Sequence, residues 1–141
     1  MVAEVRLTIT RGLSEGKVFI FHERSIGMVG RAEGSLLRLP NSPATVDVSR
    51  RHCLLDIDPP LIHVRDLGSK NGTYVNGANI GQRERGLPPE VASADMPEYA
   101  LEEGDELRVG GTIFRVSISR EAAESRQVTE TGSVLSSGTS A

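Results

Sequence analysis

Two Asn-Gly pairs, Asn71-Gly72 and Asn76-Gly77, constrain the fold of this chain more than any other feature of its sequence. Asn and Gly both tolerate the positive φ angles that tight turns require, so each pair is a hairpin-type turn signal. The residues between the pairs, 73–75, are typical of a short strand. The stretch 66–77 therefore predicts closely spaced turns within a β-structured domain.

Apolar and polar residues alternate in short runs along most of the chain. Val5, Leu7 and Ile9 fall on one face of a predicted strand, while Arg6 and Thr8 fall on the other. No segment before residue 120 has a sustained 3.6-residue period, so we expect an all-β sandwich or barrel. The predicted strands are residues 5–9, 17–21, 25–29, 36–39, 53–57, 61–64, 106–109 and 112–118.

The length of 141 residues suits one domain with a short tail. Residues 1–120 carry the strand signals and form the predicted domain. Residues 121–141 are rich in Ser, Thr, Gly, Glu and Ala without aromatic residues, which predicts a flexible tail. Residues 81–99 are polar and contain prolines, so we expect a long surface loop there.

Composition argues against several classes of protein. The formal net charge of −3 disfavours a nucleic-acid partner, which normally selects for a basic excess. No apolar run approaches the ~20 residues of a membrane span, and the alternating N-terminus lacks the apolar core of a signal peptide. The single cysteine, Cys53, excludes an internal disulfide and favours a cytoplasmic protein. A chain of this length needs no structural metal, and we expect no cofactor.

Three polar clusters lie between the strand-like runs: Gly30-Arg31, Ser49 to His52, and Ser69 to Thr73. Loops at one end of a β-scaffold are where binding groups are usually mounted. An Arg, a Ser, a Lys and an Asn brought together there would form a site for an oxyanion. The clusters therefore predict an anion-binding site built from loops.

The order and spacing of these clusters resemble the forkhead-associated (FHA) domain pattern. That pattern runs Gly-Arg, Ser-x-x-His, Asn-Gly-Thr and Asn-Gly, and the chain carries each piece in this order. The segment from Leu101 to Gly110 is similar to the family's closing segment, Leu-x-x-Gly-Asp-x-Ile-x-Ile-Gly. The resemblance covers about residues 5 to 118. It implies a β-sandwich of two mostly antiparallel sheets whose end loops bind phosphothreonine peptides, without catalysis.

The resemblance also implies roles for individual residues. Arg31 and Ser49 are expected to bind phosphate, Arg50 to add a contact, and Asn71 to hold the peptide backbone. Lys70 either binds phosphate or leans into solvent. A phosphothreonine carries about −1.5 to −2 charge and three acceptor oxygens, which an Arg fork matches along one edge. The residues expected to shape the loops are Gly30, His52, Gly72, Thr73 and Asn76.

Asp47 bears on which peptide is chosen. It lies two residues before Ser49, in a loop that in this family helps to select the side chain three residues after the phosphothreonine. A carboxylate at this position is expected to disfavour an acidic ligand residue there and to favour Lys or Arg.

Two other functions fit parts of the sequence. Ser49 and His52, with Asp47 or Asp66, are residue types of a hydrolase, although a nucleophile elbow is lacking. Alternatively, an FHA-like scaffold binds a protein partner independently of phosphate. Loss of Arg31 or Ser49 would mark such a scaffold, and both are present. We therefore expect a phosphothreonine-dependent binding module in Ser/Thr kinase signalling, and no enzyme.

Two threonines of the predicted tail, Thr129 and Thr131, are candidate phosphosites. Their segment resembles the Thr-rich segment beside certain bacterial FHA domains, which kinases phosphorylate and the domain then captures. A plain linker is an equally good interpretation. The expected partners are therefore a phosphothreonine-containing protein or peptide and a Ser/Thr kinase, with neither nucleic acid nor membrane.

Overall fold

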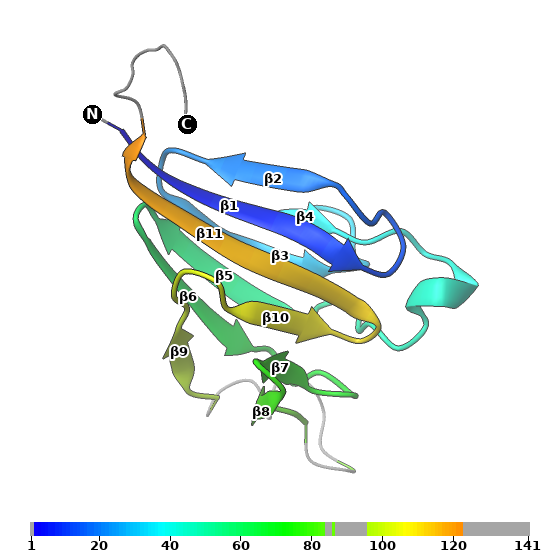
Figure 1. The fold of residues 1–141 in the computed structure, drawn as a ribbon. Helices are drawn as coiled ribbons and strands as arrows, with labels where there is room; N and C mark the ends of the chain where they lie inside the picture. The colour runs from blue at the N-terminus through cyan, green and yellow to red at the C-terminus, as the bar shows by residue number, and fades with distance from the viewer. Residues whose placement is uncertain (1, 84–85, 87–95, 123–141) are drawn as a thin grey trace.

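The computed structural model describes residues 2–83, 86 and 96–122. In this part of the chain, strands form two facing sheets and one short 3₁₀ helix lies in a connecting loop (Figure 1). No helix among the described residues has the length and apolar character to cross a membrane. The elements are β1 (Val2–Arg11), β2 (Val18–Phe21), β3 (Ser25–Gly30), β4 (Leu37–Arg38), η1 (Pro43–Thr45), β5 (Cys53–Asp58), β6 (Leu61–Asp66), β7 (Thr73–Val75), β8 (Ala78–Gly81), β9 (Glu98–Ala100), β10 (Glu106–Val109) and β11 (Thr112–Ala122).

The sheets have different sizes. Among the described residues, the first contains six strands in the order β2-β1-β11-β10-β7-β8, and the second contains five in the order β4-β3-β5-β6-β9. Neighbouring strands are antiparallel except β3 and β4, which run parallel. The prediction of an all-β sandwich with two mostly antiparallel sheets is confirmed.

The core lies between the sheets and follows from the period-two alternation of the strands. Val5, Leu7 and Ile9 of β1 are buried, as their spacing predicted. Phe114 of β11 is the largest fully buried side chain, and Leu55 of β5 comes from the opposite sheet into the same cluster. Burial of an apolar side chain of this size contributes about 1.5–3 kcal/mol to folding, so this alternation is the main source of the fold's stability.

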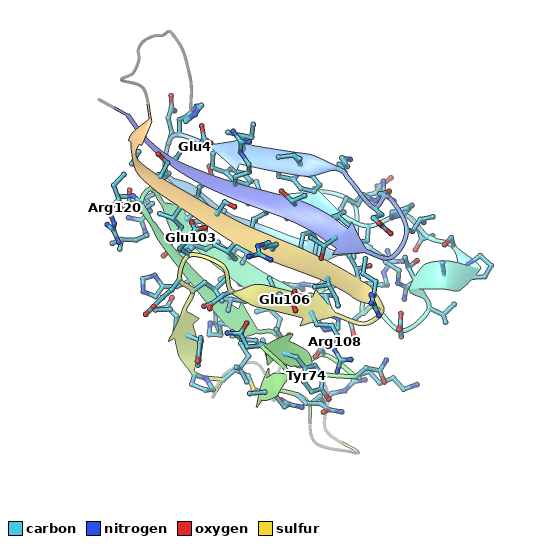
Figure 2. The ribbon with its side chains drawn as sticks, viewed as in Figure 1. Glu4, Tyr74, Glu103, Glu106, Arg108 and Arg120 are labelled. Atoms are coloured by element: carbon cyan, nitrogen blue, oxygen red, sulfur yellow. The ribbon has the colours of Figure 1, made fainter. Side chains whose placement is uncertain are left out.

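The outer face of the six-stranded sheet is polar along β10, whereas Val18 and Ile20 of β2 are exposed apolar residues. Glu106 and Arg108 of β10 point away from the core, between the buried Leu107 and Val109 (Figure 2). The guanidinium carbon of Arg108 lies 4.3 Å from the ring centroid of Tyr74 on β7. Arg108 and Tyr74 therefore join β10 and β7 on this face.

The two Asn-Gly pairs differ in what they connect. Asn76 and Gly77 have φ of +50° and +86° and form the two-residue turn of the β7–β8 hairpin, as their sequence predicted. Asn71 and Gly72 instead lie between β6 and β7, which belong to different sheets. The first pair therefore lies in a crossing loop between the sheets and not in a hairpin.

The segment predicted as a surface loop, 81–99, also contributes to a sheet. Strand β9 pairs with β6 at its edge, with Tyr99 opposite Val64, and no strand was predicted there. All three residues of β9 are exposed, so the segment has no apolar alternation that would signal a strand. Residues 84–85 and 87–95 of this loop lie outside the described residues.

The two ends of the sandwich carry different features. Strand β11 runs to Ala122, two residues into the predicted tail, because Ala122 pairs with Val2. The rest of the tail lies outside the described residues. The β10–β11 turn at Gly110 is at the opposite end, where η1 also lies (Figure 1). A Cβ on Gly110 would lie 2.7 Å from Oδ1 of Asp47, so this end also holds the loop before β5.

Candidate functional site

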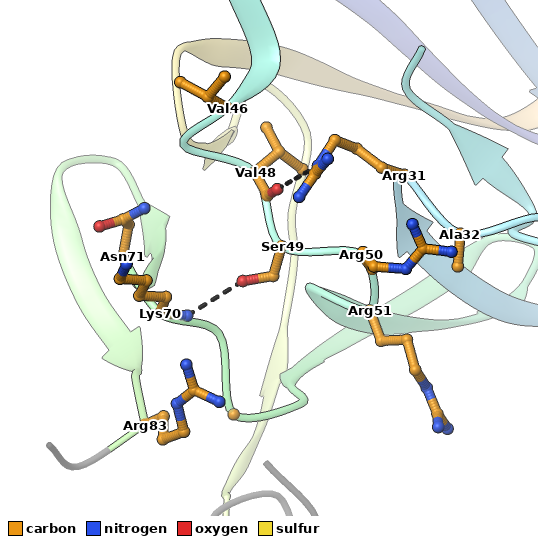
Figure 3. A pocket seen from close by; sticks show the side chains of 11 residues that line it. Arg31, Ala32, Val46, Val48, Ser49, Arg50, Arg51, Lys70, Asn71 and Arg83 are labelled. Atoms are coloured by element: carbon orange, nitrogen blue, oxygen red, sulfur yellow. Dashed lines mark hydrogen bonds between the residues drawn. The ribbon is translucent and has the colours of Figure 1, made fainter. Parts of the chain in front are cut away.

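A pocket of about 640 Å³ opens between the loops at the η1 end of the sandwich (Figure 3). Its volume falls in the range of ordinary ligand sites, about 300–1,000 Å³. The three polar clusters of the sequence meet here. The lining residues are Arg31, Ala32, Val46, Val48, Ser49, Arg50, Arg51, Gly68, Lys70, Asn71 and Arg83.

The first wall of the pocket forms where β3 ends beside the segment that precedes β5. The backbone N–H of Ala32 donates to the carbonyl of Arg50 at 2.9 Å, and that of Arg31 donates to Ser49 at 3.4 Å. A Cβ on Gly30 would lie 2.1 Å from the carbonyl oxygen of Arg50, closer than a side chain can approach. Glycine at this position therefore lets the two segments touch, which sets Arg31 beside Ser49.

The Arg31 side chain is held by two hydrogen bonds. Its Nε donates to the carbonyl of Val48 at 2.6 Å, and its Nη1 donates to Oδ1 of Asn41 at 3.0 Å. A guanidinium has five N–H donors, so three remain for a ligand. Because the Arg31 side chain is already restrained, ligand binding costs less side-chain conformational entropy than it would with a freely rotating arginine.

Ser49 belongs to the first wall and contacts the loop between β6 and β7, which forms the second wall. Its Oγ accepts a hydrogen bond from the backbone N–H of Lys70 at 3.1 Å, which leaves the hydroxyl proton free to be donated. Its backbone N–H donates to Nδ1 of His52 at 3.0 Å, and Nε2 of His52 donates to the carbonyl of Gly72 at 2.8 Å. One imidazole therefore links the loop at Ser49 to the loop at Gly72.

His52 is fully buried and neutral in this arrangement, since one ring nitrogen accepts and the other donates. Burial lowers the pKa of His52 below its ordinary value of 6.5, although the Gly72 carbonyl and the nearby carboxylates oppose the shift. Both ring nitrogens are bonded to backbone groups, and the Ser49 hydroxyl is bonded to Lys70. This differs from the Ser–His contact through the hydroxyl that a hydrolase uses.

A buried carboxylate organises the second wall. Oδ2 of Asp66 accepts from the backbone N–H groups of Gly68 and Ser69 at 2.8 and 2.9 Å. Its Oδ1 accepts from the hydroxyls of Ser69 and Thr73 at 2.5 and 2.6 Å. Oγ of Ser69 in turn accepts from the N–H of Gly72 at 3.0 Å. These bonds shape the whole crossing loop around one side chain.

Lys70 and Asn71 form the exposed tip of this loop. Nδ2 of Asn71 donates to the carbonyl of Asp47 at 2.9 Å, which ties the tip to the first wall. The carbonyl of Lys70 accepts from Nε2 of Gln82 at 2.8 Å. The amide oxygen of Asn71 remains available to accept a hydrogen bond from a ligand N–H.

The pocket concentrates positive charge. Five lining residues are cationic, and among the described residues none of the lining side chains is a carboxylate. The chain as a whole has a net charge of −3, so the cations are segregated here rather than spread evenly. Such a cleft attracts an anionic ligand and increases its rate of association.

The family of the chain follows from comparison with known proteins. Residues 27–110 match the FHA domain, and this segment includes every residue that lines the pocket. The chain belongs to the FHA family. FHA domains are binding modules, and the resemblance seen in the sequence is thereby confirmed.

Several known proteins are similar to this FHA chain. The human protein angiogenic factor with G patch and FHA domains 1 is 32% identical over 120 residues. That match covers 81% of this chain but only 15% of the length of the relative. A solved structure from an analysis of phosphothreonine-dependent FHA domain interactions has a TM-score of 0.62 and 26% identity, covering 84% of this chain and 99% of that one. The FhaA FHA domain complexed with the intracellular domain of Rv3910 has a TM-score of 0.57 and 28% identity, covering 79% and 98%.

The FHA pocket brings together most of the residues singled out in the sequence. Arg31, Ser49, Arg50, Lys70 and Asn71 all line it. The residues that hold these loops through backbone contacts or hydrogen bonds are Gly30, His52, Gly72 and Thr73.

Two of the singled-out residues lie elsewhere. Asn76 belongs to the β7–β8 hairpin, where its side chain bonds Oδ1 of Asp105 and the N–H of Glu106, each at 3.0 Å. The Asp47 carboxylate faces Gly110 and is not among the pocket-lining groups, so its role in specificity stays a prediction. The candidate phosphosites Thr129 and Thr131 lie outside the described residues.

Two residues of this site were missed in the sequence. Asp66 was given no role in building the loop, although an Asp whose side chain bonds the backbone two residues later, here at Gly68, is a known turn signal. Arg83 lay in the predicted 81–99 loop, yet its backbone N–H donates to the carbonyl of Ser69 at 2.8 Å. The hairpin turn at Asn76-Gly77, which sends the chain back beside β7, is the signal that could have placed it.

Proposed function

We propose that this FHA domain binds phosphothreonine-containing proteins or peptides in its cationic pocket. The observation that carries the proposal is that Arg31, Ser49 and Lys70 line one pocket, where the backbone N–H of Lys70 donates to Oγ of Ser49. A similar solved structure is described as that of a phosphothreonine-dependent FHA domain, which agrees with this ligand.

The donors match the chemistry of a phosphate monoester. The restrained fork of Arg31 offers three N–H groups, and charge-assisted bonds to phosphate are about twice as strong as neutral ones. The Ser49 hydroxyl adds one neutral donor. Lys70 and Arg50 add positive charge from the two sides, and the amide oxygen of Asn71 would accept from the peptide backbone.

The cellular setting is part of the same proposal. Threonine phosphate is made by Ser/Thr kinases, so we place this module downstream of such a kinase, in a binding role without catalysis. The buried, reduced Cys53 agrees with the cytoplasm, where thiols stay reduced.

The test is direct binding of degenerate peptide pools that carry phosphothreonine, phosphoserine or unmodified threonine. Arg31→Ala should weaken phosphothreonine binding by about 30-fold or more, since truncating one partner of a buried charge pair costs roughly 2–5 kcal/mol. Arg120→Ala removes the same charge from the far end of β11 and should leave binding unchanged (Figure 2). Equal binding of all three pools would instead favour a phosphate-independent scaffold.

A further inference from the structure

Arg83 gives the pocket a cation that a single phosphate does not account for. Figure 3 places Arg31 and Arg83 on opposite sides of the hydrogen bond between Ser49 and Lys70. Arg83 is half-buried, and among the described residues no side chain pairs with its guanidinium. A partly desolvated charge without a partner is costly, so this position favours an anion from a ligand.

The backbone at Arg83 is fixed to the rest of the site. Its N–H donates to the carbonyl of Ser69 at 2.8 Å, and the preceding Gln82 donates to the carbonyl of Lys70 at 2.8 Å. Oε1 of Gln82 in turn accepts from Nδ2 of Asn79 at 3.0 Å. Arg83 therefore belongs to the second wall, although it follows the end of β8.

The charge balance of the pocket points the same way. Five cationic side chains line it, whereas one phosphothreonine brings only about −2 charge. Arg51 points away from the other lining side chains (Figure 3), and its Nε donates to Sδ of Met28 at 3.4 Å. A pocket that held this phosphate alone would therefore keep an excess of about two positive charges from the other four cations. The excess includes Arg83, which lies beyond Ser49 as seen from Arg31 (Figure 3).

We infer that Arg83 is a specificity-determining residue that binds a second anionic group of the same phosphopeptide. The inference rests on the proposed function. The group is a carboxylate side chain or a second phosphate, because both offer the paired oxygens that a planar guanidinium binds through two parallel hydrogen bonds.

The test uses phosphothreonine peptides with neutral flanks and compares them with peptides that carry one Glu or one phosphoserine, scanned across the flanking positions. At one position, wild-type affinity should rise about 5-fold with Glu or about 10-fold with phosphoserine. Arg83→Gln should remove that gain. Arg120→Gln, with the same charge change far from the pocket, should keep it.

The outcomes separate the two claims. A gain with Glu identifies a carboxylate as the second group, and a gain with phosphoserine alone identifies a phosphate. If the neutral phosphopeptide binds through Arg31 but no acidic position gives a gain that Arg83→Gln removes, this inference is wrong and the proposed function stands. If no phosphothreonine peptide binds the wild-type chain, both are wrong.

Discussion

The backbone nitrogen of Ser49 lies 3.0 Å from Nδ1 of His52, so a residue at the ligand surface is held by one that is fully buried. The same imidazole reaches Gly72 on the opposite loop. The spacing of the two walls therefore depends on a neutral, fully buried side chain, and conditions that change its charge should change the pocket.

Acid should destabilise the domain through His52. Protonation would remove the acceptor for the N–H of Ser49 and place a charge in a buried site. Burial lowers the folded-state pKa of His52 below 6.5, so the unfolded chain binds more protons just below that pH. The free energy of unfolding should therefore fall as the pH drops below about 6.5, measured by urea denaturation.

The control for this pH dependence is a second histidine. His52→Asn should flatten the decrease below about pH 6.5, whereas His63→Gln, on β6, should retain it. A wild-type stability that stays level down to about pH 5 would show that His52 does not titrate in this way.

Asp66→Asn should destabilise the crossing loop between β6 and β7. The amide keeps the size of the side chain, but its N–H₂ group would face donors that bond the carboxylate in the wild-type chain. We expect a loss of about 2–4 kcal/mol in the free energy of unfolding, together with weaker peptide binding. Asp58→Asn, at the exposed end of β5, should change stability by less than ~0.5 kcal/mol. If the two substitutions lowered the free energy of unfolding equally, Asp66 would not have this role.

Gly30→Ala should separate Arg31 from Ser49. The new Cβ would meet the carbonyl of Arg50 at 2.1 Å, so the backbone contact must open, at a cost of about 1–3 kcal/mol. Peptide affinity should fall with it. Gly16→Ala introduces only backbone strain, at φ +96° with no atom within 4 Å, and should leave affinity unchanged. Crystal structures of the two variants would show whether the contact opens only in the first.

Phosphorylation of the tail should promote association between molecules. Ala122 lies at the end of the 11-residue strand β11, about 35 Å from the β10–β11 turn beside the pocket. The nine residues from Ala122 to Thr131 reach only about 30 Å, which makes binding within one molecule unfavourable. A chain phosphorylated at Thr129 or Thr131 should therefore form concentration-dependent oligomers by light scattering, and Arg31→Ala should abolish them. A phosphorylated monomer that no longer binds added phosphopeptide would contradict this.

Local patterns in the sequence were enough to predict most of the fold. The alternation of Val5, Leu7 and Ile9 predicted β1, and Asn76-Gly77 predicted a tight turn, because side-chain period and positive φ are properties of neighbouring residues. The order of the polar clusters resembled a known family, and this was enough to predict five of the residues that line the pocket: Arg31, Ser49, Arg50, Lys70 and Asn71.

The features that were missed depend on partners far along the chain. Strand β9 exists because Tyr99 pairs with Val64, and three exposed residues give no periodic signal of their own. Arg83 reaches the pocket only through the return of β8 beside β7. The Asn71-Gly72 pair has the composition of a hairpin turn, yet the buried bonds of Asp66 determine that it crosses between sheets.

The walls of the pocket come from both sheets: the first follows β3 of the five-stranded sheet, and the second includes the segment after β8 of the six-stranded sheet. A peptide bound between the walls would contact loops of both sheets and hold the sheets together at this end of the sandwich. A ligand that binds only the folded state adds about 2.7 kcal/mol of stability when present at 100 times its Kd. The resistance of this domain to proteolysis would then increase when its partner is phosphorylated and decrease when it is not. The lifetime of the domain in the cell would therefore depend on kinase activity.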